Sequence, residues 1–145
     1  MNEDRAKTCT LITASCTTSW LDWAHGELWL CPTGLLRRSV GLIRTIRHMN
    51  RQTVDPSDRP TRAFGLEEIA QIRAADRRNR WIAWAEITNA TLKRGVIDHS
   101  LHLELGVGRR EKLLWLRIDG GYDPLELALA WELPGRYRAV RKPIG

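Results

Sequence analysis

The side chains with the clearest binding chemistry in this chain are basic, and they are gathered in one segment. Residues 37–80 hold 11 arginines and 5 acidic residues, whereas the remaining 12 basic and 12 acidic residues balance. Basic groups that converge on one surface attract phosphate, anionic lipid or an acidic partner, although such a segment can also be a solvated face without a ligand. The candidate anion- or partner-binding residues are Arg37, Arg38, Arg44, Arg47, Arg77, Arg78, Arg80, Lys93 and Arg94.

Two tryptophans lie beside this basic segment, in the stretch NRWIAWAEITNATLKRG of residues 79–95. The chain has seven Trp, one Phe and two Tyr, and an indole ring suits positions that are half apolar and half hydrated. On a strand, Trp81 and Trp84 point to opposite faces, so they cannot form one platform for stacking nucleic-acid bases. We predict that one packs in the core and that the other lies beneath a helix that precedes it.

No pattern of residues predicts catalysis, a cofactor or a metal site. Cys9, Cys16 and Cys31 give no C-x-x-C pair of the kind that binds zinc. His99 and His102 are three residues apart on a predicted strand, so they face opposite ways and are expected at the surface. The chain has neither a G-x-S-x-G nucleophile motif nor a phosphate-binding loop. We therefore predict a protein that is not an enzyme, with no catalytic residue, no cofactor and no metal.

The expected compartment is the cytoplasm. The three cysteines are odd in number, which fits a reducing environment better than a disulfide framework. The charged start MNEDRAK and the short apolar run TLITA do not match a signal peptide. No stretch approaches the ~20 apolar residues that a membrane-spanning helix needs.

Length and apolar content predict a single domain over residues 1–145. A chain of 145 residues, 43% of them hydrophobic, is large enough to form a core. Strand signals in its first half surround a long polar insertion. The predicted segments are a tail at 1–8, a strand at 9–16, a hairpin across ELWLC–PTG–LLRRSV, a basic insertion at 45–79 with a helix at 66–77, and a basic tail at 134–145.

The second half of the chain has the period-two pattern of an antiparallel meander. The predicted strands are RWIAW, ITNATLKRG, SLHLELGV and EKLLWLRI. In the third strand, Leu101, Leu103, Leu105 and Val107 are expected on one face. The fourth strand has apolar residues on both faces, which indicates that it is covered on both sides.

A C-terminal amphipathic helix is predicted to follow the meander. Asp123 is the expected N-cap, with Glu126 completing a capping box, and Tyr122 and Leu127 are expected to form a hydrophobic staple. Its apolar stripe consists of Leu125, Ala128, Leu129 and Leu133, widened by Leu127 and Trp131. A single helix cannot cover its own apolar face, so we expect it to dock on the sheet or to plug the end of a barrel.

The phrase IAWAEI at residues 82–87, the strands after it and the terminal helix resemble the second half of a bacterial pleckstrin-homology-like (PH-like) domain, of an actinobacterial type rich in Arg and Trp. ELWLCPTGLLRRSVG resembles the early hairpin of such domains. The resemblance implies an α+β fold, an antiparallel open barrel or strongly bent sheet with a C-terminal capping helix. It also implies that Trp131 packs into the barrel. The inserted helix departs from the usual fold, and the basic cluster of lipid-binding members is reduced to Arg37 and Arg38.

These observations predict a cytoplasmic binding or interaction module with a protein as its partner. Such a partner predicts an exposed apolar patch, rimmed by arginine, around Trp20, Trp23 or Trp29. Nucleic-acid binding through the basic 37–80 segment is one alternative, and binding of an anionic lipid or a phosphate ligand is another. The sequence leaves the oligomeric state open.

Overall fold

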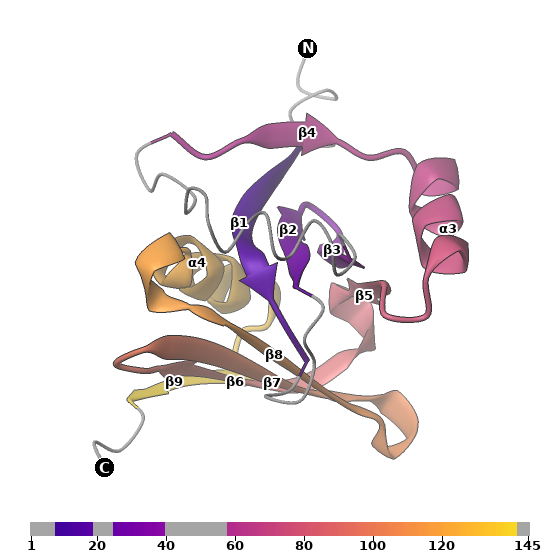
Figure 1. The fold of residues 1–145 in the computed structure, drawn as a ribbon. Coiled ribbons are helices and arrows are strands. Elements are labelled where there is room, and N and C mark those ends of the chain that lie inside the picture. The colour runs from indigo at the N-terminus through magenta and orange to yellow at the C-terminus, as the bar shows by residue number, and fades with distance from the viewer. Residues whose placement is uncertain (1–7, 19–24, 40–57, 142–145) are drawn as a thin grey trace.

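The structure is a computed structural model that describes residues 8–18, 25–39 and 58–141. The described residues form an α+β fold of two sheets and two helices (Figure 1). One helix lies against the opening between the sheets, and the other lies beside the first sheet. In these parts of the chain, no helix combines the length and the apolar composition needed to cross a membrane.

The first sheet has five strands in the order β4-β1-β2-β3-β5. The strands are β1 (Thr8–Cys16), β2 (Gly26–Cys31), β3 (Gly34–Ser39), β4 (Thr61–Ala63) and β5 (Arg80–Ala83). All of their pairings are antiparallel, and β2 and β3 form the predicted hairpin. Glycine is required at position 34, because a Cβ atom there would lie 2.3 Å from the carbonyl oxygen of Ile82 in β5.

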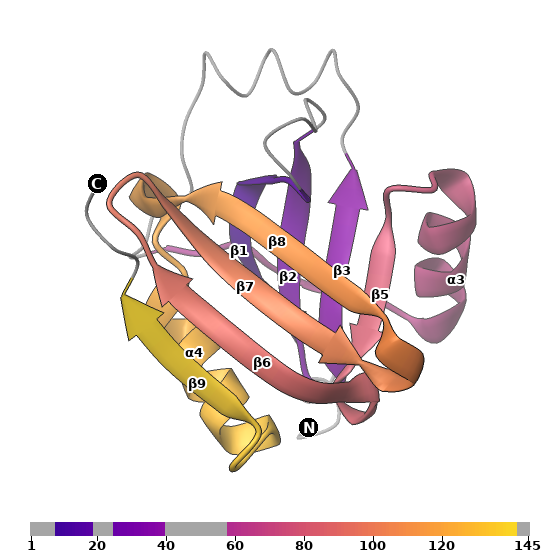
Figure 2. The same cartoon turned by 90° about the horizontal axis from the view of Figure 1, so that it is seen from below.

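The second sheet has four strands in the order β8-β7-β6-β9. The strands are β6 (Ile87–Arg94), β7 (Asp98–Leu105), β8 (Arg110–Leu116) and β9 (Tyr137–Arg141). The first three form the predicted meander, whereas β9 comes from the predicted basic tail and pairs in parallel with β6. The strands of this sheet cross those of the first at a steep angle (Figure 2). A bridge between Thr17 and Leu114 links the sheets, and the described strands do not close into a barrel.

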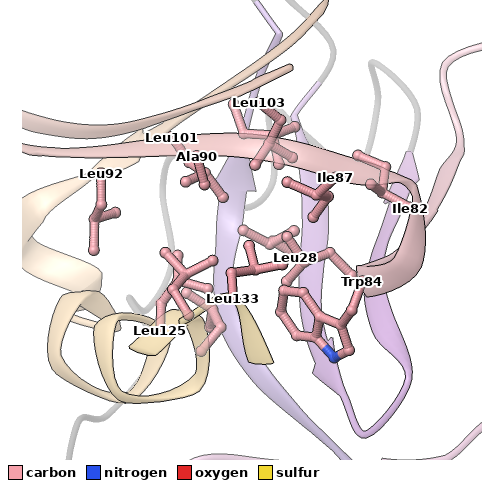
Figure 3. Close-up of a cluster of buried hydrophobic side chains, with 14 of the residues drawn as sticks. Leu28, Ile82, Trp84, Ile87, Ala90, Leu92, Leu101, Leu103, Leu125 and Leu133 are labelled. Atoms are coloured by element: carbon pink, nitrogen blue, oxygen red, sulfur yellow. The ribbon is translucent and has the colours of Figure 1, made fainter. Parts of the chain in front are cut away.

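The main hydrophobic core fills the space between the two sheets and helix α4 (Tyr122–Glu132), as Figure 3 shows. Leu28 of the first sheet and Leu101 of the second are both fully buried in it. The helix contributes Leu125, Leu129 and Leu133, which recur every four residues and therefore lie on one side. The expectation that the terminal helix docks on the sheets is confirmed.

A smaller core lies on the other face of the first sheet, beneath helix α3 (Leu66–Ala75). Its buried members are Cys9, Leu11, Trp29, Cys31, Leu36, Phe64 and Ile69. Trp81 packs against this smaller core, whereas Trp84 belongs to the main core. The predicted separation of the two tryptophans is therefore confirmed. The first sheet is covered on both faces because the insertion folds back over it.

The start of α4 differs from the prediction. The helix is capped by Gly121 at φ 81°, and Asp123 lies in the first turn without capping it. A Cβ atom at position 121 would lie 2.5 Å from a side-chain carbon of β1, so this close approach also requires glycine. Asp123 instead forms an ion pair with Arg94 at 2.9 Å. The predicted staple is also wrong, because Tyr122 is buried and Leu127 is exposed.

Two strands end earlier than predicted. Val107 lies in the turn after β7 with φ 67°, fully exposed, instead of continuing the buried face of the strand. β8 ends at Leu116. Leu116 and Ile118 were expected on the same face as Leu114, but both are exposed whereas Leu114 is buried. The buried middle of β8 is covered on both sides, as its apolar residues predict.

A disulfide bond joins Cys9 of β1 to Cys31 of β2. Because Thr10 pairs with Leu30 in this antiparallel ladder, the two cysteines lie directly opposite each other, with Cα atoms 4.2 Å apart. Cys16 is free and buried. The expectation of reduced cysteines is wrong for this pair, which removes the cysteine argument for a reducing compartment.

Candidate functional site

The first group of predicted binding residues lies on β3, on β5 and in the turn before β5. Arg37 and Arg80 are paired across the two strands. Arg37 is buried, and its guanidinium donates hydrogen bonds to the carbonyl oxygens of Arg78 at 2.7 Å and Cys16 at 3.3 Å. This guanidinium is therefore directed into the protein, where it links β3 to the end of β1 and to the turn before β5.

Three other arginines of this group are held by carboxylates. The pairs are Arg38 with Glu27 at 3.8 Å, Arg78 with Asp76 at 3.0 Å and Arg80 with Glu111 at 3.2 Å. Hydrogen bonds from the side chain and backbone of Arg78 lower the pKa of Asp76. Arg77 is exposed. These pairs neutralise part of the positive charge that the sequence concentrates here.

Lys93 and Arg94 lie at the end of β6, in the other sheet. The guanidinium of Arg94 stacks over the ring of Tyr122 at 4.0 Å and pairs with Asp123, so it fastens β6 to the start of α4. Arg44 and Arg47 lie outside the described residues. The described candidates are thus divided between two sheets, and most of them have structural partners.

A buried polar cluster that the sequence did not signal joins β1 to the short helix η3 (Arg117–Asp119). Arg59 donates to two backbone carbonyls of β1 and to that of Asp119, at 2.8 to 3.2 Å. The Asp119 carboxylate accepts hydrogen bonds from the hydroxyls of Thr13 and Ser15. Burial lowers the pKa of Arg59, and the charge of Asp119 partly opposes that effect. Because these groups satisfy one another, the cluster is a structural link rather than a reactive site.

His99 and His102 have different surroundings on β7. Within the described ranges, no three His, Cys, Asp or Glu side chains are placed to hold a metal ion. His99 is buried beside the rings of Trp115 and Tyr122, with centroids 5.8 and 5.2 Å away, and its Nδ1 accepts a hydrogen bond from the Gly95 amide. The prediction of a surface position is therefore wrong for His99, while His102 is half-buried.

The surface feature best suited to binding is an apolar groove of about 500 Å³ between α4 and the strands β1 and β2. Six of its lining residues are Leu30, Pro32, Trp84, Leu127, Ala128 and Trp131. Trp131 is 83% exposed and Leu127 is 74% exposed. The indole nitrogen of Trp84 donates to the Pro32 carbonyl oxygen at 3.1 Å, which fixes one wall of the groove. We call this surface the α4 groove.

The exposure of Trp131 corrects the expectation that it packs into a barrel. Leu127 and Trp131 are four residues apart, and each lies two residues from a core position of α4. At 3.6 residues per turn, that offset places them on the side of the helix opposite Leu125 and Leu129. The helical period of the sequence already separates Leu127 and Trp131 from Leu125 and Leu129. The predicted apolar stripe was too wide because it included all four residues.

The groove also differs in place and charge from the predicted patch. Trp29 is buried in the smaller core, and Trp20 and Trp23 lie outside the described residues. The α4 helix has no arginine or lysine to rim the groove. Its charged residues are Asp123, Glu126 and Glu132. The groove is therefore apolar, and its acidic border is the single lining residue Glu132.

The fold and this groove define an α+β protein with an exposed apolar surface on its C-terminal helix. No protein-family model matches the chain, and no curated protein matches its sequence. The geometry of the groove is therefore the basis for a functional proposal.

Proposed function

We propose that the chain is a non-enzymatic interaction module, PH-like in architecture, that binds a protein partner in the α4 groove. The observation that carries this proposal is the exposure of Trp131 and Leu127 beside a concave apolar surface. Clustered exposed apolar side chains mark interaction sites, and tryptophan is enriched among the residues that contribute most to protein binding.

The order of the elements supports the PH-like part of the proposal. Strands β1, β2, β3 and β5 follow one another in the first sheet, and the meander β6-β7-β8 follows in the second. Helix α4 then inserts its apolar side into the core between them. This is the order that the sequence resemblance implies, with two additions: β4 extends the edge of the first sheet, and α3 packs against its outer face.

The lining of the groove favours binding over catalysis. General acid–base or nucleophilic chemistry requires at least two reactive groups within hydrogen-bond reach. Glu132 is the ionisable group among the lining residues, and Cys31 is bonded to Cys9. The acidic border favours a partner segment that combines apolar anchors with basic neighbours, since complementary charge directs association.

A pull-down from native extract tests the proposal with three immobilised proteins. We expect the wild-type chain and Val107→Ala, which alters an exposed residue outside the groove, to capture the same partner. Trp131→Ala should capture at least about 10-fold less, because truncating a central interface tryptophan commonly costs 2 kcal/mol or more. Equal capture by Trp131→Ala would refute the role of the groove.

A further inference from the structure

A second exposed apolar surface lies where β6 turns into β7 and where β8 ends. It consists of Val96, Ile97, Leu116 and Ile118, which are 65%, 71%, 42% and 67% exposed. The Arg117 amide donates to the Ile97 carbonyl oxygen at 2.9 Å, and Leu116 is paired with Asp98 at the start of β7. The four side chains therefore belong to one corner of the second sheet, which we call the aliphatic corner.

The composition of this corner is unusual for a turn. Turn positions favour Gly, Pro, Asn, Asp and Ser, whereas β-branched residues are typical of strands. Here the turn between β6 and β7 is Gly95-Val96-Ile97, and Ile118 lies in η3 after β8. Among the described residues these side chains are exposed, so a partner surface accounts for them better than internal packing does.

The aliphatic corner and the α4 groove are complementary. The corner lies at a turn, and its exposed charged neighbour is Arg117, between Leu116 and Ile118, while the half-buried Asp98 follows Ile97. The groove is apolar, and it has Glu132 in its lining. From this match in polarity and from the opposite charges of Arg117 and Glu132, we infer that the chain self-associates head to tail, with the aliphatic corner of one copy docked in the α4 groove of the next. Arg117 then lies against Glu132 of the neighbouring copy.

The two surfaces cannot satisfy each other within one chain. Both are built on elements packed into the same core, and Ile97, Ile118 and Trp131 remain exposed in the folded molecule. Because the contacting surfaces differ, the interface is heterologous, so each assembly keeps a free groove at one end and a free corner at the other unless a ring closes. The inference rests on the proposed function, since it names the occupant of the same groove.

Sedimentation equilibrium of the purified chain measures this association. We expect the weight-average mass to rise above that of the 16.7-kDa chain as the concentration increases from about 5 to 500 μM, because small interfaces are weak. Ile97→Asp in the corner and Trp131→Asp in the groove should each leave a monomer. Val107→Asp, an equally exposed change outside both surfaces, should associate like the wild type. Circular dichroism tests whether each variant is folded. If Ile97→Asp is not folded, Ile118→Asp replaces it in the corner, and if Trp131→Asp is not folded, Glu132→Lys replaces it in the groove.

A mixture of the two disabled variants distinguishes head-to-tail docking from a symmetric dimer. Ile97→Asp retains its groove and Trp131→Asp retains its corner, so together they should form a one-to-one dimer of twice the monomer mass that grows no further. A mixture that stays monomeric refutes the inference, as does a wild-type chain that is monomeric at every concentration. If the groove-dependent pull-down still succeeds in that case, the proposed function stands with a different partner. If association occurs but survives Trp131→Asp, head-to-tail docking in the groove is refuted, and the pull-down with Trp131→Ala alone decides the proposed function.

Discussion

At the scale of single residues, Asp119 is the side chain on which the link between β1 and η3 depends. It is 3% exposed, and its carboxylate accepts hydrogen bonds from Thr13 and Ser15 and interacts with the charge of the half-buried Arg59. Removing one member of a buried polar cluster leaves the others without partners. We expect Asp119→Ala to lower the free energy of unfolding by about 3 kcal/mol in a urea titration.

Asp123 provides the matched control for this substitution. It is the next aspartate in the chain and it also pairs with an arginine, but its side chain is exposed to solvent. Exposed ion pairs contribute at most about 1 kcal/mol, so Asp123→Asn should have a small effect. Similar losses for the two variants would show that the cluster around Asp119 is not a structural link.

The carboxylate of Asp76 should make the stability of the fold depend on pH. Hydrogen bonds from Arg78 hold its pKa below the ordinary value of 3.8. A carboxyl group whose pKa is lower in the folded chain stabilises the fold above its unfolded pKa, and this contribution disappears as the pH falls through the folded pKa. We expect wild-type stability to fall more steeply than that of Asp76→Asn between about pH 5 and pH 2, measured by urea unfolding. Parallel pH profiles would contradict this assignment.

The position of a residue could be predicted from the sequence when it depends on neighbours within the same element, and not when it depends on residues far away in the chain. Strand periodicity predicted that Trp81 and Trp84 separate, and their positions in different cores confirm this, although Trp84 lies just beyond β5 in a short 3-10 helix. Arg59 and Asp119 are 60 residues apart in the sequence, with most of the described strands between them, so no local pattern signals their pairing. Arg37 looks like a surface arginine in the sequence, but it is buried because the chain on both sides offers it carbonyl oxygens.

At the scale of elements, the Cys9–Cys31 disulfide holds β1 to β2 next to the α4 groove. The two cysteines are separated by 22 positions in the sequence. Loops of this size give about 3 kcal/mol of stabilisation in the chain-entropy description of disulfides. We therefore expect reduction with dithiothreitol, or the Cys9→Ser/Cys31→Ser variant, to lower the free energy of unfolding by about that amount. An unchanged urea midpoint after complete reduction would contradict it.

Most elements could be predicted from the sequence, and the errors share one cause. The meander strands have clear alternation, and α4 has a clear apolar side, so their existence did not depend on distant contacts. The ends of elements did depend on such contacts. Helix α4 begins at Tyr122 because Gly121 must pass close to β1, and the pairing that makes β9 a strand is offered by β6. The α4 groove is lined by residues of α4 and of the strands β1 and β2, so it could not be located from the sequence of the helix alone.

At the scale of the whole molecule, the insertion turns the first sheet into the middle layer of the fold. Helix α4 and the second sheet cover one face, and Ile69 and Ile72 of α3 pack against the smaller core on the other. β2 and β3 lie inside this sheet and have neighbouring strands on both sides, whereas β4 and β9 are short edge strands with mostly exposed residues. Protection from solvent should therefore differ strongly between these elements.

Amide hydrogen exchange followed by mass spectrometry measures that difference. Amides in strands covered on both faces exchange only when the fold opens globally, whereas edge strands open locally at little cost. We expect peptides from β2 and β3 to exchange slowest and peptides from β4 and β9 to exchange fastest among the described strands. In Ile69→Asp, which places a charge beneath α3, protection of β3 should fall while β6 and β7 retain theirs. Equal loss in both sheets would mean that the two cores open as a single unit, because a charge beneath α3 would then destabilise sheet strands that it does not touch.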